Sequence, residues 1–549
     1  MSLRFLVLAL AVVLGGCRSS EAPAPAASAT VAEVPAPASL LAELSLGNPK
    51  QTWQLLRQLG GDRAQALPSS LPVLLATSLS FPPAVASSLD EQLPMVGVAL
   101  AGDAGRGPDL VLGMHVVSGA ELVASLTLGD GARFRRAELG PRLVRLLPAP
   151  GGAEFNGALG VSGNYLLAAT RVGALEQAGR FVAESVSKRA RTEPGLTLRA
   201  SEGVVKGQLA SALRASWRAR REALAARAAE ERRERGRPDF ADPEALLAGV
   251  DGTVESLLGV LESAKELRFT AAPEGDRLRL ELSLLPGSEG AAALLASEMV
   301  LGRLAPLLRL PSDTAAALLW RGEPQPKEGE AGLTQSLARL FGERLTPEQT
   351  ERLARTLDRF SRSRRGAVVL GLTSGPTALV ATFELADQAA FMTAVPEVLA
   401  LLELGPVSSW LSGTLGKPSV QRLAKRGEVE RARVRFAQAA SATALPKTVH
   451  ASWQARDGVG YVALSAEEDD VLSSFLLKSP LSSSVWLQRT QPELAPRAGL
   501  GVFLDASLVA PRGPEEAPLL LTMGKREQAV VIALDVSAPA LRAAAGVLR

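Results

Sequence analysis

The chain has almost none of the residues from which disulfides and most metal sites are built. Its 549 residues include one cysteine and two histidines. A single cysteine excludes an intrachain disulfide, and a zinc site needs several Cys or His side chains at defined spacings. His115 and His450 lie far apart in the sequence, and we expect both to be structural residues. The sequence therefore predicts no metal and no cofactor.

An excess of one charge is also missing. Lys and Arg together number 60 and Asp and Glu 57, so the net charge is +3. Nucleic-acid-binding proteins usually carry a marked basic excess, and we expect no nucleic-acid partner. The apolar fraction of 47% and the charged fraction of 21% are typical of globular proteins. They argue against a disordered or fibrous chain.

One uncharged stretch, residues 66–89, is long enough to suggest a membrane span. It contains many serines and four prolines, namely Pro68, Pro72, Pro82 and Pro83. A membrane-spanning helix rarely carries so many helix-breaking residues. We expect short helices here, packed on an N-terminal sheet.

The N-terminus has the pattern of a secretory signal peptide. Arg4 precedes the apolar run 5–14, which is too short to span a bilayer. The run ends in Leu14-Gly15-Gly16-Cys17, which resembles the lipobox of bacterial lipoproteins. This resemblance covers only the first 17 residues. It implies cleavage before Cys17 and acylation of that residue, which would anchor the protein to a membrane because two or more acyl chains bind stably.

The residues that follow the lipobox indicate a destination membrane and a tether. In enterobacterial lipoproteins an Asp after the acylated cysteine retains the protein at the inner membrane, so Arg18 favours the outer membrane. Up to residue 39 the chain is rich in Ala and Pro and lacks the large apolar residues that a core needs. A Pro-rich linker extends by about 3.1 Å per residue, so this one could reach up to about 70 Å from the membrane.

The rest of the chain repeats a succession of strand, tight turn, strand and helix. Strand pairs with this pattern occur at 96–100 with 109–117, 157–161 with 165–170, 267–271 with 277–285, 367–372 with 377–385, 449–454 with 459–464, and 519–523 with 530–536. Polar and apolar residues alternate in 277–282, which indicates a sheet with one wet face. The fold class predicted is α+β, with two globular halves of duplicated strand-turn-strand-helix units, antiparallel sheets and a long Arg-rich helix between the halves.

These patterns predict five segments. They are a signal peptide at 1–16, a lipidated Cys17 with its tether at 17–39, an N-terminal α+β domain at 40–205, an Arg-rich helical connector at 206–243, and a C-terminal α+β domain at 244–549. A further helix is expected after Thr346, which can act as an N-cap with Pro347 and Gln349 behind it.

The Arg-rich helix is the most prominent candidate for an interaction surface. Its arginines are Arg214, Arg218, Arg220, Arg221, Arg227, Arg232, Arg233 and Arg235. They favour either a solvated connector or a surface for an anionic partner, such as lipid headgroups, polysaccharide or an acidic envelope protein.

Catalytic motifs are few. Ser185 and Lys188 match the S-x-x-K pattern of penicillin-binding enzymes, but the companion motifs are missing. A buried Ser185 would remove that interpretation. The acidic run 467–470 follows Ser465 at a predicted helix start, where Ser465 and Glu468 can form a capping box; calcium binding is the alternative.

Three functions fit this inventory. We expect a membrane-anchored envelope lipoprotein with a non-catalytic binding or scaffolding role, and therefore not an enzyme. One alternative is a periplasmic carrier of an apolar ligand or lipid, because sheets with an apolar face can form a groove. The other is a hydrolase whose active site no motif reveals.

Overall fold

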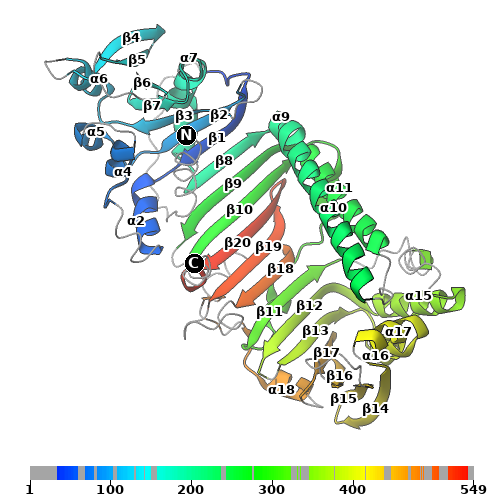
Figure 1. Cartoon of the computed structure of the whole chain (residues 1–549). Coiled ribbons are helices and arrows are strands. Elements are labelled where there is room, and N and C mark those ends of the chain that lie inside the picture. Colours follow the sequence, from blue (N-terminus) through cyan, green and yellow to red (C-terminus); the bar gives the residue numbers. More distant parts are fainter. Residues whose placement is uncertain are drawn as a thin grey trace. The chain divides into compact units, whose positions relative to one another are not determined.

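A computed structural model gives the fold of the chain (Figure 1). The residues that it describes are 34–59, 68–78, 83–102, 108–128, 132–140, 142–149, 157–193, 195–235, 243–274, 277–322, 331, 334–335, 345–375, 377–414, 416–437, 447–467, 471–481, 484, 486–487, 498–505 and 517–541.

The chain divides into two compact units that do not follow its order. Unit 1 comprises Met1–Leu209, Ala264–Gly287 and Ile532–Arg549, and unit 2 comprises Ala210–Ser263 and Ser288–Val531. The domain boundaries predicted at residues 205 and 243 therefore differ from those of the units. Residues 264–287 belong to unit 1 because their first strand pairs with the strand that precedes the Arg-rich helix.

The strands of unit 1 are all antiparallel to their neighbours. They are β1 (Leu40–Leu46), β2 (Met95–Leu100), β3 (Asp109–His115), β4 (Phe134–Gly140), β5 (Leu143–Pro148), β6 (Ala158–Ser162), β7 (Tyr165–Ala169), β8 (Leu196–Ser201), β9 (Ala264–Glu274) and β10 (Arg277–Pro286). Their order across the sheet is β4-β5-β6-β7-β3-β2-β1-β8-β9-β10. Next to β10 lies β20 (Ala529–Ser537), whose residues from Ile532 onward belong to unit 1.

Helices of unit 1 cover both faces of this sheet. Those on one face are α2 (Pro49–Leu59), α4 (Leu71–Ser78), α5 (Pro83–Ser88) and α6 (Gly119–Thr127). The short helices predicted within 66–89 are thus confirmed, and Leu71 and Val85 are buried in the core. The opposite face packs against α7 (Val172–Phe181) and the π-helical turn η1 (Val182–Val186), which leads into α8 (Ser187–Ala190).

The strands of unit 2 are likewise antiparallel to their neighbours. They are β11 (Thr314–Arg321), β12 (Arg364–Ser374), β13 (Thr377–Leu385), β14 (Pro418–Arg426), β15 (Val429–Phe436), β16 (Thr448–Arg456), β17 (Val459–Ser465), β18 (Ala498–Asp505) and β19 (Pro518–Arg526). Their order is β14-β15-β16-β17-β13-β12-β11-β18-β19. The same order occurs in unit 1 along β4-β5-β6-β7-β3-β2-β1-β8-β9. Each strand of unit 2 corresponds to the strand of unit 1 whose number is ten lower.

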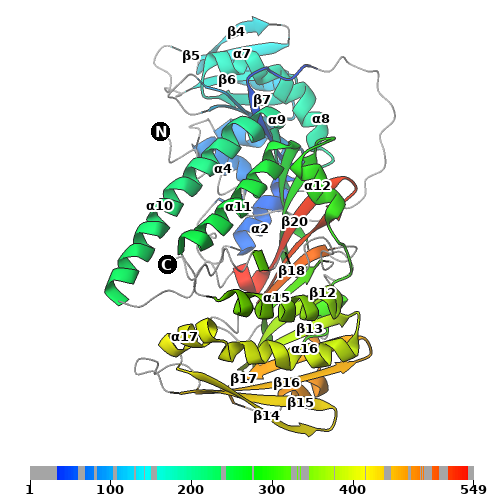
Figure 2. The same cartoon turned by 90° about the vertical axis from the view of Figure 1, so that its right-hand side faces the viewer.

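Two pairs of helices cover the sheet of unit 2. On one face, α13 (Ala305–Leu308) and α18 (Val471–Leu477) pack over a core that includes Val369 and Val380. On the other face, α15 (Pro347–Arg362) and α16 (Gln388–Ala400) pack over Phe383 and Trp453 (Figure 2). The order of strands and helices, with antiparallel pairing throughout, confirms the α+β class.

Hydrogen bonds and backbone angles define several local features of the fold. The Gln51 N–H donates to Asn48 Oδ1 at 3.2 Å at the start of α2. Thr346 and Gln349 form the predicted capping box at the start of α15. The turn at Asp457 and Gly458 has positive φ at both residues, 51° and 76°, as tight hairpin turns require.

The Arg-rich helix is α10 (Ala210–Arg235), and it forms a hairpin with α11 (Pro243–Glu262), which runs beside it in both views (Figures 1 and 2). It contacts α11 through polar side chains, and two of its apolar residues, Leu213 and Leu224, are 43% and 48% exposed. The helix begins at residue 210 rather than 206, because a π-helical turn, η2 (Val205–Leu209), precedes it.

Candidate functional site

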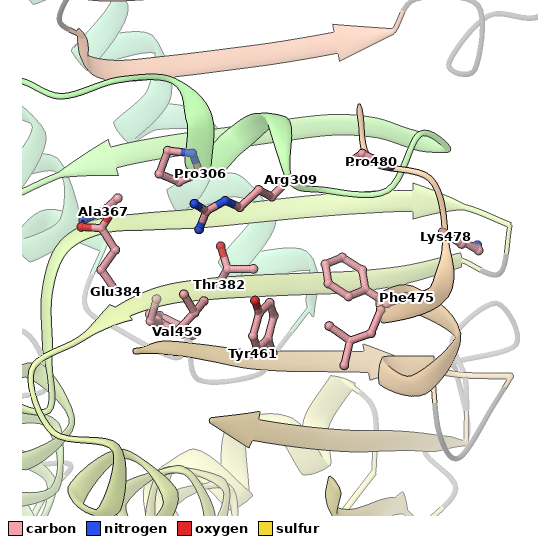
Figure 3. Close-up of a pocket in the computed structure, with 12 residues that line it drawn as sticks. Pro306, Arg309, Ala367, Thr382, Glu384, Val459, Tyr461, Phe475, Lys478 and Pro480 are labelled. Carbon is pink, nitrogen blue, oxygen red and sulfur yellow. The ribbon is translucent and has the colours of Figure 1, made fainter. Parts of the chain in front are cut away.

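A cavity for a small ligand lies in unit 2, between α13, α18 and the sheet (Figure 3). Its volume is about 270 Å³, the space of about nine water molecules. Strands β12, β13 and β17 form the floor. The lining residues are Pro306, Arg309, Ala367, Thr382, Phe383, Glu384, Val459, Tyr461, Phe475, Leu476, Lys478 and Pro480.

Three polar groups point into this cavity. Arg309, at the end of α13, Thr382 of β13 and Tyr461 of β17 converge on its centre (Figure 3). Thr382 and Tyr461 face the same way because β13 and β17 pair with these two residues opposite each other. The Phe475 ring of α18 completes the wall, with its centroid 6.2 Å from that of Tyr461.

The electrostatics of the cavity favour an anion. Arg309 is exposed and makes no ion pair with any residue whose position is described. Burial raises the pKa of the Tyr461 hydroxyl, an effect that the positive charge of Arg309 partly opposes, so Tyr461 remains a neutral donor at neutral pH.

The two other charged groups at the cavity are already engaged. Lys478 Nζ donates to Asp313 Oδ2 at 2.8 Å and to the carbonyl oxygen of Gly375. Glu384 Oε2 accepts the N–H of Ala367 at 2.9 Å. The cavity therefore offers one uncompensated cation, two hydroxyls and an aromatic ring. This set suits the binding of a small organic anion with an apolar body.

A second feature of unit 2 is an apolar area on the opposite face of the same sheet. We call it the open face and define it by Leu318, Trp320, Leu370, Leu372 and Leu379, whose side chains are 37–51% exposed. Leu318 lies opposite Leu370 across β11 and β12, and Leu372 lies opposite Leu379 across β12 and β13. The register therefore makes these side chains neighbours on one surface.

The arginines predicted as an anionic-partner surface have different environments. Arg214 Nη2 binds Glu255 and Glu262 of α11 at 3.2 and 3.0 Å. Arg221 Nε lies 2.7 Å from Asp251, which also accepts a hydrogen bond from the Trp217 indole. These two arginines thus hold the hairpin together. Arg218, Arg220 and Arg227 are exposed, and the side chains of Arg232, Arg233 and Arg235 are outside the described set.

The two residues of the S-x-x-K match have different environments. Ser185 is 1% exposed, and its hydroxyl donates to the Val34 carbonyl oxygen at 3.0 Å. Lys188 is exposed on α8. A buried serine whose hydroxyl is occupied by the backbone removes the Ser185–Lys188 interpretation.

The histidines and acidic residues have local roles. His115 Nδ1 lies 3.4 Å from Asp90 Oδ2, and its ring packs edge-on against Tyr165. Burial lowers the pKa of His115. His450 is half-buried in β16. The Glu467 N–H donates to the Ser465 hydroxyl at 3.1 Å, whereas Glu468 to Asp470 and Cys17 lie outside the described residues.

Two searches over the described residues bear on membranes and metals. None of the helices there is long and apolar enough to cross a membrane. Within the same ranges, no three His, Cys, Asp or Glu side chains are grouped so that they could hold a metal ion.

The residues of the cavity were not found by sequence reasoning. Arg309, Thr382, Tyr461 and Phe475 come from four separate elements and form no motif. Comparison of the chain with protein-family models, curated proteins and solved structures found no match.

Proposed function

We propose that this protein is a lipid-anchored lipoprotein of the cell envelope with a non-catalytic binding role. The lipobox Leu14-Gly15-Gly16-Cys17 supports the anchor, and Arg18 supports the outer membrane as the destination. The tether that follows would hold the folded units away from the lipid surface. The acyl chains on Cys17 supply the membrane contact, so no spanning helix is required.

The observation that carries the binding role is the cavity around Arg309. Its lining combines a cation without an ion pair in the described structure with two hydroxyl groups and the Phe475 ring. The other two charged side chains at the cavity are engaged, Lys478 by Asp313 and Glu384 by the Ala367 N–H. This arrangement favours recognition of a small anion over its chemical conversion.

Titration calorimetry of the full chain with benzoate tests this proposal. We expect benzoate to bind and its neutral analogue benzyl alcohol to bind more weakly, because only the carboxylate can pair with Arg309. Arg309→Gln should weaken benzoate binding about tenfold, the value of a charge-assisted hydrogen bond.

Arg352→Gln is the matched control for this titration. Arg352 is an exposed arginine on α15 that does not line the cavity, so its replacement removes the same charge elsewhere. Equal binding of benzoate to wild type and Arg309→Gln would contradict the proposed role of the cavity.

A second candidate function, transport of an apolar ligand or lipid, is favoured by the open face. Single exposed apolar side chains are common, but a contiguous apolar area usually marks an interaction site. The five side chains of the open face come from three adjacent strands and are at least 37% exposed.

We also propose that the two units are copies of one ancestral unit. The support is the common strand order, in which β1 to β9 correspond to β11 to β19. On this proposal the repeated element is a whole sheet with its helices, larger than a single hairpin and helix. The α10–α11 hairpin, between β8 and β9, is then an insertion that distinguishes the copies.

A further inference from the structure

The open face of unit 2 is bordered by more apolar surface. Three half-buried residues of β18 and three of β19 lie on the same side of the sheet by register: Leu500, Val502, Leu504, Leu519, Leu521 and Met523. The apolar surface thus crosses the sheet from β13 to β19. The cavity around Arg309 is on the other side of this sheet, because Ala317 and Leu319, which alternate with Leu318 and Trp320, face the core beneath α13.

A single cation stands at one end of the open face. The Arg364 guanidinium lies over the Trp320 ring, 5.6 Å from its centroid. Arg364 is half-buried, and its Nε–H has no hydrogen-bond partner. It also makes no ion pair with the described part of the chain. Burial lowers the pKa of Arg364, but a guanidinium remains charged in proteins.

A cation in this position favours an anionic group beside it. Removing a charge from water without a partner is unfavourable, and a phosphate or carboxylate would supply the missing hydrogen bonds. The five side chains that define the open face are all apolar. The complementary ligand therefore has a charged head at Arg364 and an apolar body along the strands.

The dimensions of the open face indicate which apolar group of a ligand fits it. Residues in a strand advance by about 3.4 Å, so the stretch from Val368 to Leu372 covers about 14 Å. One leaflet of a bilayer core is about 15 Å thick, which is the length of an acyl chain. Neighbouring strands are about 4.8 Å apart, so the five strands from β13 to β19 span about 19 Å. This width accepts two chains side by side.

We propose that the open face binds a phospholipid, with its phosphate against Arg364 and its two acyl chains along β12 and β11. The proposal rests on the second candidate function, lipid transport, and gives it a site and a ligand. It involves no covalent step. The match of one cation to one phosphate, and of the length and width to two chains, favours a phospholipid over a protein partner.

The test uses the full chain with Cys17→Ser, which removes the acceptor of the proposed anchor. The protein is incubated with vesicles of phosphatidylglycerol and phosphatidylcholine and then separated from them by flotation. Phospholipid in the soluble fraction is measured by mass spectrometry. We expect phosphatidylglycerol or phosphatidylcholine to leave the vesicles with the protein in a fixed ratio.

Three variants locate the site. Leu318→Gln and Leu372→Gln should each reduce captured phospholipid about tenfold, because the two residues are 38% and 44% exposed and offer that apolar surface to the ligand. Arg364→Gln should reduce it by a similar factor, and Arg364→Lys should recover part of the loss. Leu477→Gln is the control, since Leu477 is 88% exposed on α18, at the opposite side of the sheet.

The outcomes are decisive. Absence of phospholipid in the soluble fraction would overturn the proposal, as would capture that Leu318→Gln and Leu372→Gln leave unchanged. A copurified polypeptide in place of lipid on this face would overturn it as well. A failure of benzoate binding, or of acylation at Cys17, would leave this result unaffected, because the assay uses neither.

Discussion

The buried ion pair around Asp535 allows a quantitative prediction for unit 1. Asp535 is fully buried, and its Oδ1 lies 3.2 Å from Arg277 Nε, while its Oδ2 lies 3.5 Å from Arg279 Nη1. The Arg277 side chain is 2% exposed and the Arg279 side chain 12%. Replacing Asp535 by Ala removes a fully buried counter-charge shared by both arginines, of which Arg277 also pairs with the more exposed Glu274 and Arg279 with the neighbouring Glu281.

The expected loss follows from this burial. Removing one partner of a buried ion pair destabilises a protein by about 3–5 kcal/mol, whereas an exposed pair contributes about 0–1 kcal/mol. The matched control is Glu138→Ala, because Glu138 pairs with Arg136 at 3.1 Å with side chains 73% and 56% exposed. Asp535→Ala should therefore lower the free energy of unfolding several times more than Glu138→Ala does.

Hydrogen exchange under increasing urea provides the assay. Peptides from β9 and β10 report the opening free energy of the region that contains Arg277, independently of unit 2. In a double variant, Arg277→Met with Asp535→Leu, most of the stability should return, because two apolar side chains carry no desolvation penalty. An Asp535→Ala protein within about 1 kcal/mol of wild type, or a double variant no better than the single one, would refute the reasoning.

Two further predictions concern pH. Hydrogen bonds from Arg221 and then Trp217 lower the pKa of Asp251, so the α10–α11 hairpin should be protected at neutral pH and open as pH falls through that lowered value. Hydrogen exchange of α11 measures this opening. If the hairpin of Asp251→Asn exchanged at the same rate as that of wild type at neutral pH, the prediction would be contradicted. Burial lowers the pKa of His115 below 6.5, so unit 1 should lose stability as pH falls from about 6.5 towards the lowered value. In urea unfolding, the free energy of unfolding of His115→Gln should depend less on pH in this range than that of wild type. An equal pH dependence in the two proteins would contradict the burial argument.

Much of the local structure could be predicted from the sequence. The capping box at Thr346 depends on residues near one another in the chain, and it was located correctly. Alternation of polar and apolar residues identified the hairpin of β9 and β10 for the same reason.

The division into units could not be predicted in this way. It depends on pairing between β8 and β9, which are separated by the whole α10–α11 hairpin. No local pattern encodes a contact over that distance. The resemblance between successive hairpins also concealed the longer period, in which the order of nine strands recurs.

The candidate site was likewise beyond a sequence pattern. Arg309 and Tyr461 approach each other only because α13 and β17 meet over the same sheet. In the sequence, the residues of the open face show only the ordinary alternation of strands β11 and β12. This alternation does not distinguish an exposed leucine such as Leu372 from a buried one, because exposure depends on which helices cover the sheet. Arg364 could not be assigned to this surface from the sequence, because its contact is with Trp320, a residue of another strand.

The central claim, that the protein is held at a membrane by lipid on Cys17, has a direct test. Cells of a bacterial host expressing the full chain are labelled with an alkyne analogue of palmitate, and the mature protein is examined for label and for sedimentation with membranes. We predict a labelled wild-type protein in the membrane fraction and an unlabelled Cys17→Ser protein released from it. A mature wild-type protein without label, distributed between membrane and aqueous fractions as Cys17→Ser is, would contradict the account.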